Sequence, residues 1–205
     1  MKKIWLLLSV LVLSFAVVGC TPEEEEEDPT EKDVDIALAL TWQEELVGKT
    51  VYLTTCGQAD VEIVQNILGV AGVAETAYTK DNLLTAAEVT NGSVVIMVVG
   101  SSGKGLGAAG TDVTAENVRA QAFASKANLG DIALIVVHVG GTARRGELSD
   151  TIIASALSGG DLALVVQTGD ADDFFTDRAS DTAPLYLFSS ASKLVPAFKV
   201  LFGIE

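Results

Sequence analysis

Residues 93–110 read SVVIMVVGSSGKGLGAAG, a strand pattern followed at once by a run rich in glycine. Residues 94–99 are all apolar, and strands that are apolar at every position are typical of parallel sheets covered on both faces. Similar apolar runs, separated by stretches with helical spacing, occur at 51–56, 132–137, 162–166 and 185–188. This alternation predicts one α/β domain over residues 36–205, with a doubly wound, mostly parallel, five-stranded sheet between two helical layers. A flavodoxin-like or Rossmann-like strand order is expected.

Helices are expected between the strands, where apolar residues recur every three or four positions. The predicted helices cover 61–68, 81–88, 114–128, 148–157 and 173–179, with a closing helix that Ser190 caps and that turns Leu194, Phe198 and Leu201 inward. Residues 74–78 predict a weak strand, and residues 36–48 an extra edge strand or a covering segment. The glycine-rich stretches 100–110 and 140–146 are expected to be loops.

The composition limits the classes of function. The chain has 205 residues, 49% of them hydrophobic, with 2 cysteines, 1 histidine and a formal net charge of −15. The apolar content excludes a mostly disordered protein, and two cysteines exclude a disulfide-rich scaffold. One histidine and two cysteines exclude most zinc sites, and the negative charge argues against nucleic acid as a partner. No metal and no cofactor are therefore predicted.

The first twenty residues have the pattern of an export signal. Two lysines follow Met1, an apolar run covers 4–18, and Gly19 precedes Cys20. The stretch resembles the lipobox of bacterial lipoproteins, in which the signal (here 1–19) is removed and the cysteine is lipidated. The resemblance implies that lipid on Cys20 anchors the exported domain to a bacterial membrane of the cell envelope. The alternative is an ordinary secretory signal in which Cys20 has no role.

An acidic stretch follows this signal. Residues 21–35 hold nine acids, including Glu23 to Glu27, against one base. Charges at this density repel one another, so residues 20–35 are expected to form an extended tether; cation binding is the alternative. Without the signal and the tether, 19 acids and 10 bases remain in residues 36–205, a net charge of −9.

The scarce basic residues gather in the two glycine-rich stretches. Lys104, Arg144 and Arg145 lie there, after strands whose carboxyl ends bind ligands in open α/β sheets. Glycine lets backbone N–H groups approach an anion, and arginine can bind a carboxylate or phosphate through two hydrogen bonds. We therefore expect a small anionic metabolite to bind here; the alternative is that the arginines pair with Glu147 and Asp150. The predicted ligand-binding residues are Thr55, Gln58, Ser101, Ser102, Lys104, Gly105, His138, Gly140, Gly141, Arg144 and Arg145.

His138, the single histidine, is a weak candidate for catalysis. As a general acid or base, or as the base for a Cys56 nucleophile, it would make the protein an enzyme. Bonded to loop backbone, it would be structural, and the protein a binding module or a scaffold for envelope proteins. An acidic cluster is interpreted as a solvated helix start rather than a calcium site; it comprises Asp170, Asp172, Asp173 and Asp177.

Three motifs carry a resemblance to a protein family. They are KGLGAAG at 104–110, HVGG at 138–141 followed by ARRG at 143–146, and TTCGQ at 54–58 followed by Asp60. With them, most of residues 50–202 resembles an uncharacterised family of exported bacterial proteins. In that family the loop that corresponds to residues 54–58 is closer to T-S-x-G-Q-S, and the departure at Cys56 argues against a catalytic role for this thiol. The resemblance implies which loops matter, but it names neither a ligand nor an activity.

Overall fold

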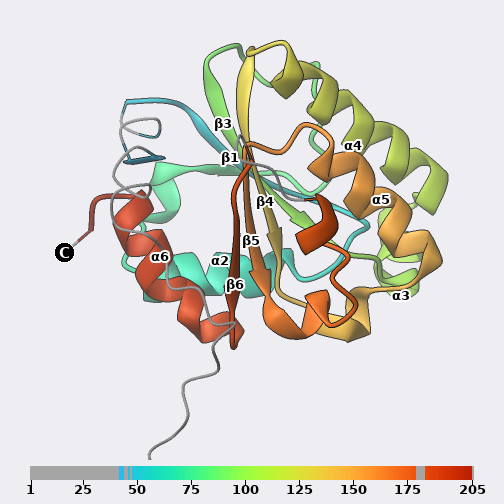
Figure 1. Cartoon of the computed structure of the whole chain (residues 1–205). Helices are drawn as coiled ribbons and strands as arrows, with labels where there is room; N and C mark the ends of the chain where they lie inside the picture. The colour runs from blue at the N-terminus through green and yellow to red at the C-terminus, as the bar shows by residue number, and fades with distance from the viewer. Residues whose placement is uncertain (1–41, 44–45, 47, 179–182, 205) are drawn as a thin grey trace, which may run out of the picture.

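Six parallel strands form one sheet in the computed structural model, which describes residues 42–43, 46, 48–178 and 183–204. The order is β2-β1-β3-β4-β5-β6 (Figure 1). The strands are β1 (Val51–Cys56), β2 (Thr79–Lys80), β3 (Ser93–Val99), β4 (Ile132–His138), β5 (Leu162–Val166) and β6 (Leu185–Phe188). The predicted α/β class is confirmed, whereas the expected count of five strands is wrong because the short β2 adds a sixth.

Helices pack on both faces of the sheet, as Figure 1 shows. On one face lie α2 (Val61–Val70) and α6 (Leu194–Leu201), and on the other α4 (Val113–Asn128) and α5 (Glu147–Leu157). Successive residues of β3 point to opposite faces, so Ile96 and Met97 belong to different hydrophobic clusters. All seven residues of β3 are buried, and the six that follow Ser93 are apolar, as expected for a strand covered on both faces.

The register of the strands brings their carboxyl ends to one edge of the sheet. Cys56 of β1 pairs with Val99 of β3, and Val98 of β3 pairs with Val137 of β4. The segments that follow β1, β3 and β4 therefore emerge side by side. This is the edge at which the sequence predicts a ligand site.

Two predictions between β1 and β3 are wrong. Residues 75–77, expected within a strand, form a 3-10 turn, and β2 begins only at Thr79. The helix expected at 81–88 is a series of turns. Side chains in this segment bond the local backbone, as in turns: Asp81 Oδ1 accepts from Leu83 N at 2.9 Å. Glu88 Oε2 likewise accepts from Thr85 N at 2.8 Å and from Thr85 Oγ1 at 2.7 Å.

The first glycine-rich stretch is also not the loop that was expected. Residues Gly103–Ala109 form helix α3, and the second stretch contains a 3-10 turn at Gly141–Arg144. Ser102 caps α3, since its side chain accepts a hydrogen bond from Gly105 N at 3.2 Å. Gly110 ends the helix in the left-handed conformation, with φ 68°. Leu106 is the buried residue of this helix.

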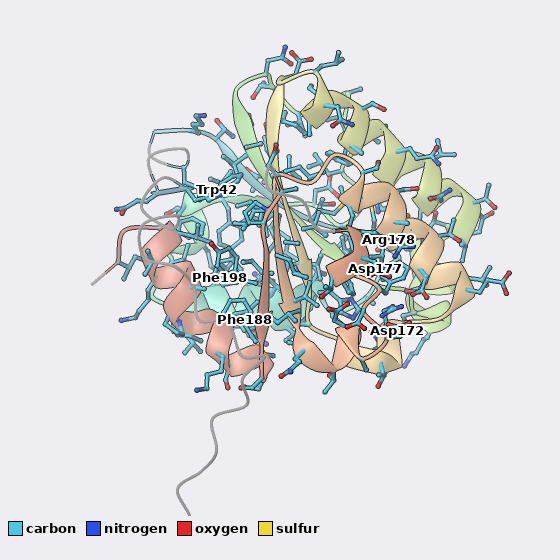
Figure 2. The ribbon with its side chains drawn as sticks, in the orientation of Figure 1. Trp42, Asp172, Asp177, Arg178, Phe188 and Phe198 are labelled. Carbon is cyan, nitrogen blue, oxygen red and sulfur yellow. The ribbon has the colours of Figure 1, made fainter. Side chains whose placement is uncertain are left out.

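The later helices agree better with expectation. Helices α4 and α5 each begin one residue before the predicted start. In place of the helix at 173–179, the described part holds a 3-10 turn at Thr176–Arg178, on the side of the sheet opposite α6 (Figure 2). A 3-10 turn at Ala191–Lys193 precedes α6, and Ser190 makes no capping hydrogen bond to it. The inward residues of α6 are buried as predicted: Leu194, Phe198 and Leu201.

The segment before β1 covers part of the core. Leu46 is buried, and Trp42 packs against the same cluster as Phe188 and Phe198 (Figure 2). This fits the covering role expected for residues 36–48, as far as those residues are described. The predicted signal, lipidated Cys20 and acidic tether lie outside the described residues. Within the described residues, no helix combines the length and apolarity needed to cross a bilayer.

Candidate functional site

An open groove of about 410 Å³ lies at the carboxyl edge of β1, β2 and β3. It is bounded by the β1–α2 loop and the start of α2, by two residues that follow β2, and by α3. The lining residues are Gln58, Ala59, Asp60, Val61, Glu62, Asn82, Leu83, Gly105, Ala108 and Ala109. Gln58 and Gly105 are the sequence-predicted residues among them. The groove therefore lies beside β1 and β3 rather than between the two glycine-rich stretches.

The β1–α2 loop has a constrained backbone. Gln58 and Asp60 are in the left-handed region, with φ values of 57° and 60°. Such conformations cost non-glycine residues free energy and concentrate at functional sites. Helix α3 is pressed against this loop: a Cβ on Gly105 would lie 2.0 Å from the carbonyl oxygen of Gln58. Only glycine permits this approach between two residues that line the groove.

A buried ion pair on α4 holds the same loop. Glu116 is 1% exposed, and its Oε2 accepts hydrogen bonds from Gly57 N at 2.7 Å and from Gln58 Nε2 at 3.2 Å. Arg119 donates to Glu116 Oε2 at 2.5 Å and to the carbonyl oxygen of Thr55. The pair thus fixes the end of β1 and the first residues of the groove.

The sequence analysis missed both members of this pair. Glu116 and Arg119 lie on the helix face that also carries the buried Ala120 and Phe123. Two opposite charges three residues apart on an apolar helix face were the available signal, because buried charges are almost always paired. That face could be recognised only from the period of the apolar residues around it.

Arg144 adjoins the groove through Asp60. Its Nε donates to Asp60 Oδ1 at 3.1 Å and to Oδ2 at 3.2 Å, and the Asp60 side chain is 8% exposed. The two Nη groups of Arg144 have no hydrogen-bond acceptor among the described residues, and its side chain is 35% exposed. This arginine therefore retains the edge of its guanidinium for a carboxylate or phosphate.

Arg145 is adjacent to Arg144 in sequence, but its guanidinium makes all its hydrogen bonds within the protein. Its Nε and Nη2 bond Asp150, its Nη1 and Nη2 bond Asp172, and its Nη1 also bonds the carbonyl oxygen of Gly169. Its guanidinium lies 4.1 Å from the centre of the Phe174 ring. Burial lowers the pKa of Arg145, but the hydrogen bonds to both carboxylates outweigh it and raise this pKa above its ordinary value. All five donors are satisfied, so this residue has the structural pairing with Asp150 that the sequence left as an alternative.

His138 is completely buried at the end of β4. Its Nδ1 lies 2.9 Å from the carbonyl oxygen of Val99, and its Nε2 lies 3.1 Å from that of Gly141. Its ring also contacts that of Phe175, with centroids 5.1 Å apart. Burial lowers the pKa of His138, against the two backbone hydrogen bonds, which raise it. These contacts are those of a structural histidine, and no ring nitrogen is presented to the groove.

Cys56 is equally buried, at the end of β1. Burial raises the pKa of its thiol to about 12, although the charge of Arg119 acts in the opposite direction. The reactive form of cysteine is the thiolate, which this environment disfavours. The geometry therefore gives no support to a nucleophilic Cys56 paired with His138.

The other predicted residues serve mainly as structure around the groove. Thr55 donates to the carbonyl oxygen of Ala59 at 3.1 Å, and Ser101 N donates to Ser149 Oγ at 2.8 Å. Lys104 is exposed on α3. Gly140 lies against Arg144, and Gly141 against Thr168, where a Cβ would come within 2.4 Å of each neighbour.

The acidic cluster after β5 is divided among separate roles. Asp170 accepts hydrogen bonds from Phe175 N at 2.6 Å and from Thr176 N at 3.2 Å, and Asp172 pairs with Arg145. No group of His, Cys, Asp or Glu side chains in the described ranges could hold a metal ion. Asp170 therefore caps a turn, and Asp172 is the partner of an ion pair.

The groove carries unpaired polar groups of both kinds. The backbone N–H groups of Asp60, Val61 and Glu62, at the start of α2, have no acceptor in the part of the chain that is described. Helix N-termini attract anions through such groups. Asn82 Oδ1 is a buried acceptor without a donor in the described structure. Buried polar atoms without partners are rare in native proteins, so Asn82 Oδ1 is an unusual feature of this groove.

Comparison with known proteins identifies the family of this domain. Residues 48–202 match the family described as "Domain of unknown function (DUF6305)". The chain belongs to the DUF6305 family. The groove, Arg144 and the Glu116–Arg119 pair all lie within the DUF6305 match. Searches of curated proteins and of solved structures each gave no match. The expectation of an uncharacterised domain family is thus confirmed, and that of an exported lipoprotein stays a prediction.

Proposed function

We propose that this DUF6305 protein is a membrane-anchored lipoprotein whose domain binds a small anionic ligand in the groove between α2 and α3. Lipid on Cys20 would hold it at the cell envelope, and residues 20–35 would tether the domain. The anchor rests on the basic head, the apolar run and the Gly19–Cys20 junction in the sequence. The ligand site rests on the geometry of the groove.

One observation carries the ligand proposal. The unpaired Nη groups of Arg144 adjoin a groove whose backbone N–H groups at the start of α2 also lack acceptors. Both sets of donors suit the oxygens of a carboxylate or phosphate. Asp60 binds only the Nε of Arg144. This contact orients the guanidinium and leaves its two Nη groups available to a ligand.

The fold supports a ligand site at this place. The order β2-β1-β3-β4-β5 corresponds to that of the flavodoxin-like, doubly wound class, and β6 extends it. We assign the domain to that three-layer class. In such sheets, ligands bind outside the carboxyl ends of the strands where the order reverses, which here is between β1 and β3.

A calorimetric titration of the full-length protein with acetate and with inorganic phosphate tests the proposal. Arg144→Gln should weaken binding tenfold or more, because it removes charge-assisted hydrogen bonds. Arg178→Gln is the matched control, since Arg178 bonds the Phe174 carbonyl oxygen, stacks on that ring and is not among the residues that line the groove. Equal affinity of the two variants would overturn the role of Arg144.

A second pair of variants tests the groove itself without altering charge. Ala108→Trp fills the groove from an exposed position of α3, and Ala115→Trp places the same ring on an exposed position of α4. We expect loss of anion binding in the first variant only, with unchanged thermal stability in both. Failure of wild type to bind either anion would refute the proposed function.

A further inference from the structure

The groove is lined by side chains of two different characters. The start of α2 contributes the carboxylates of Asp60 and Glu62, and it adjoins the Arg144 guanidinium. The α3 helix contributes Ala108 and Ala109, and the segment after β2 contributes Leu83. The carboxylates thus lie at the α2 side and the α3 wall is aliphatic, whereas the segment after β2 contributes both Leu83 and the amide of Asn82.

Leu83 is the unusual member of the aliphatic set. It is 46% exposed, although its neighbour Leu84 is 4% exposed and packs in the core. Asp81 Oδ1 holds the Leu83 backbone N–H at 2.9 Å, so the turn fixes where this side chain begins. A large aliphatic side chain held at a groove, rather than in the core, offers apolar area to whatever occupies the groove.

The charges at the polar side are balanced in pairs. Arg144 faces Asp60, and Lys80 lies 2.9 Å from Glu62. A single additional negative group on a ligand would meet the free edge of Arg144 and the α2 N–H groups, whereas a multiply charged ligand would also face the two carboxylates. The groove therefore favours one acidic group joined to an uncharged body.

We infer that the ligand is a monocarboxylic acid with an aliphatic chain, its carboxylate at Arg144 and the start of α2 and its chain against Leu83, Ala108 and Ala109. This inference rests on the proposed function and specifies its ligand class. A volume of about 410 Å³ lies in the range of small-molecule sites. The apolar part supplies affinity through burial, and the carboxylate supplies orientation.

The test is a titration of the full-length protein with acetate, butyrate, hexanoate and octanoate, together with inorganic phosphate and hexanol. Burial of each added methylene should tighten binding about fourfold until the chain outgrows the groove. Leu83→Asn should flatten this increase while leaving acetate affinity unchanged. Leu129→Asn is the matched control, because Leu129 is 78% exposed and lies outside the groove lining; it should behave as wild type.

The outcomes separate this inference from the proposed function. If acetate and phosphate bind through Arg144 but affinity does not rise with chain length, the aliphatic inference fails and the anion site stands. An increase that persists in Leu83→Asn also refutes the inference. Hexanol binding as tightly as hexanoate, with no effect of Arg144→Gln, would refute the anion site as well.

Discussion

His138 shows that a side chain capable of catalysis can be structural when it is buried. The ring belongs to the last residue of a buried strand, at the edge that binds ligands in open α/β sheets, and this position made it the catalytic candidate. Its two nitrogens face two backbone carbonyls, and a neutral imidazole can donate to only one of them. Removal from water nevertheless dominates and lowers the pKa of His138. The residue is therefore neutral at pH 7 and joins the ends of β3 and β4.

This shift has a consequence for acid stability. Because the folded pKa lies below the ordinary value of 6.5, the unfolded chain binds a proton more readily than the native one. The contribution of His138 to stability is therefore present above pH 6.5 and is lost as the pH falls below it. The imidazole proton resonances of the single histidine should titrate below pH 6.5 in the native protein.

His138→Gln is the control, since glutamine does not titrate. Its unfolding free energy, measured by denaturant titration, should fall less between pH 6.5 and 5 than that of wild type. A native histidine that titrates at or above pH 6.5 would contradict the assignment.

At the scale of elements, α4 positions the β1–α2 loop. Glu116 accepts hydrogen bonds from the loop and from Arg119, and the exposed fraction of its side chain is 1%. Removing one member of a buried ion pair leaves the other charge uncompensated, which costs more than the pair itself contributes. One helix on a face of the sheet thus determines the geometry of a groove at its edge.

Glu116→Gln should reduce the unfolding free energy by about 3 kcal/mol, because it leaves the largely buried Arg119 without its counter-charge. Glu62→Gln changes the same residue type at a side chain that is 64% exposed. Exposed ion pairs contribute about 1 kcal/mol or less, so this control should change stability little. Urea unfolding monitored by circular dichroism measures the change in unfolding free energy of both variants. A loss below 1 kcal/mol for Glu116→Gln would show that the pair is not a structural anchor.

The sequence predicted the strands well and the glycine-rich segments poorly. Strands β3 and β4 are buried on both faces, so continuous apolar residues identify them. Helix α3 was missed because its composition favours a loop, while its cap at Ser102 and the burial of Leu106 depend on neighbouring elements. Propensity is a weak signal when tertiary contacts decide the outcome.

The candidate site shows the same division. The edge of the sheet followed from strand order alone, which holds for any doubly wound sheet. Arg144 and Arg145 were indistinguishable in sequence, because their difference depends on Asp60, Asp150 and Asp172 in space. The role of Glu116 likewise depends on a partner 59 positions earlier in the chain.

At the scale of the whole molecule, the net charge of −15 is the sum of +2 in residues 1–19, −8 in residues 20–35 and −9 in residues 36–205. The domain retains −9, and its described cations are largely engaged in ion pairs or carbonyl contacts. A long-range field of this sign repels anions, so affinity for the proposed ligand should come from short-range contacts at Arg144. In the proposed lipoprotein, residues 20–35 would add negative charge between the domain and the membrane.

The anchor itself is testable through the two cysteines of the chain. In a bacterial host fed labelled palmitate, Cys20→Ala should abolish incorporation of label and release the protein from membranes. Lipid chains provide this attachment through buried methylenes, which the substitution removes. Cys56→Ala is the matched control and should retain the label, because Cys56 is buried in the domain. Label retained in Cys20→Ala would exclude lipidation at this residue.

Helix α3 has three glycines in its seven residues, at positions 103, 105 and 107. Each costs about 1 kcal/mol relative to alanine, so the helix persists through its caps and through Leu106 rather than through intrinsic preference. Its exposed positions 107 and 108 can change without disturbing the sheet, whereas Gly105 cannot. Substitutions at positions 107 and 108 should therefore reshape this wall of the groove while leaving the sheet unchanged.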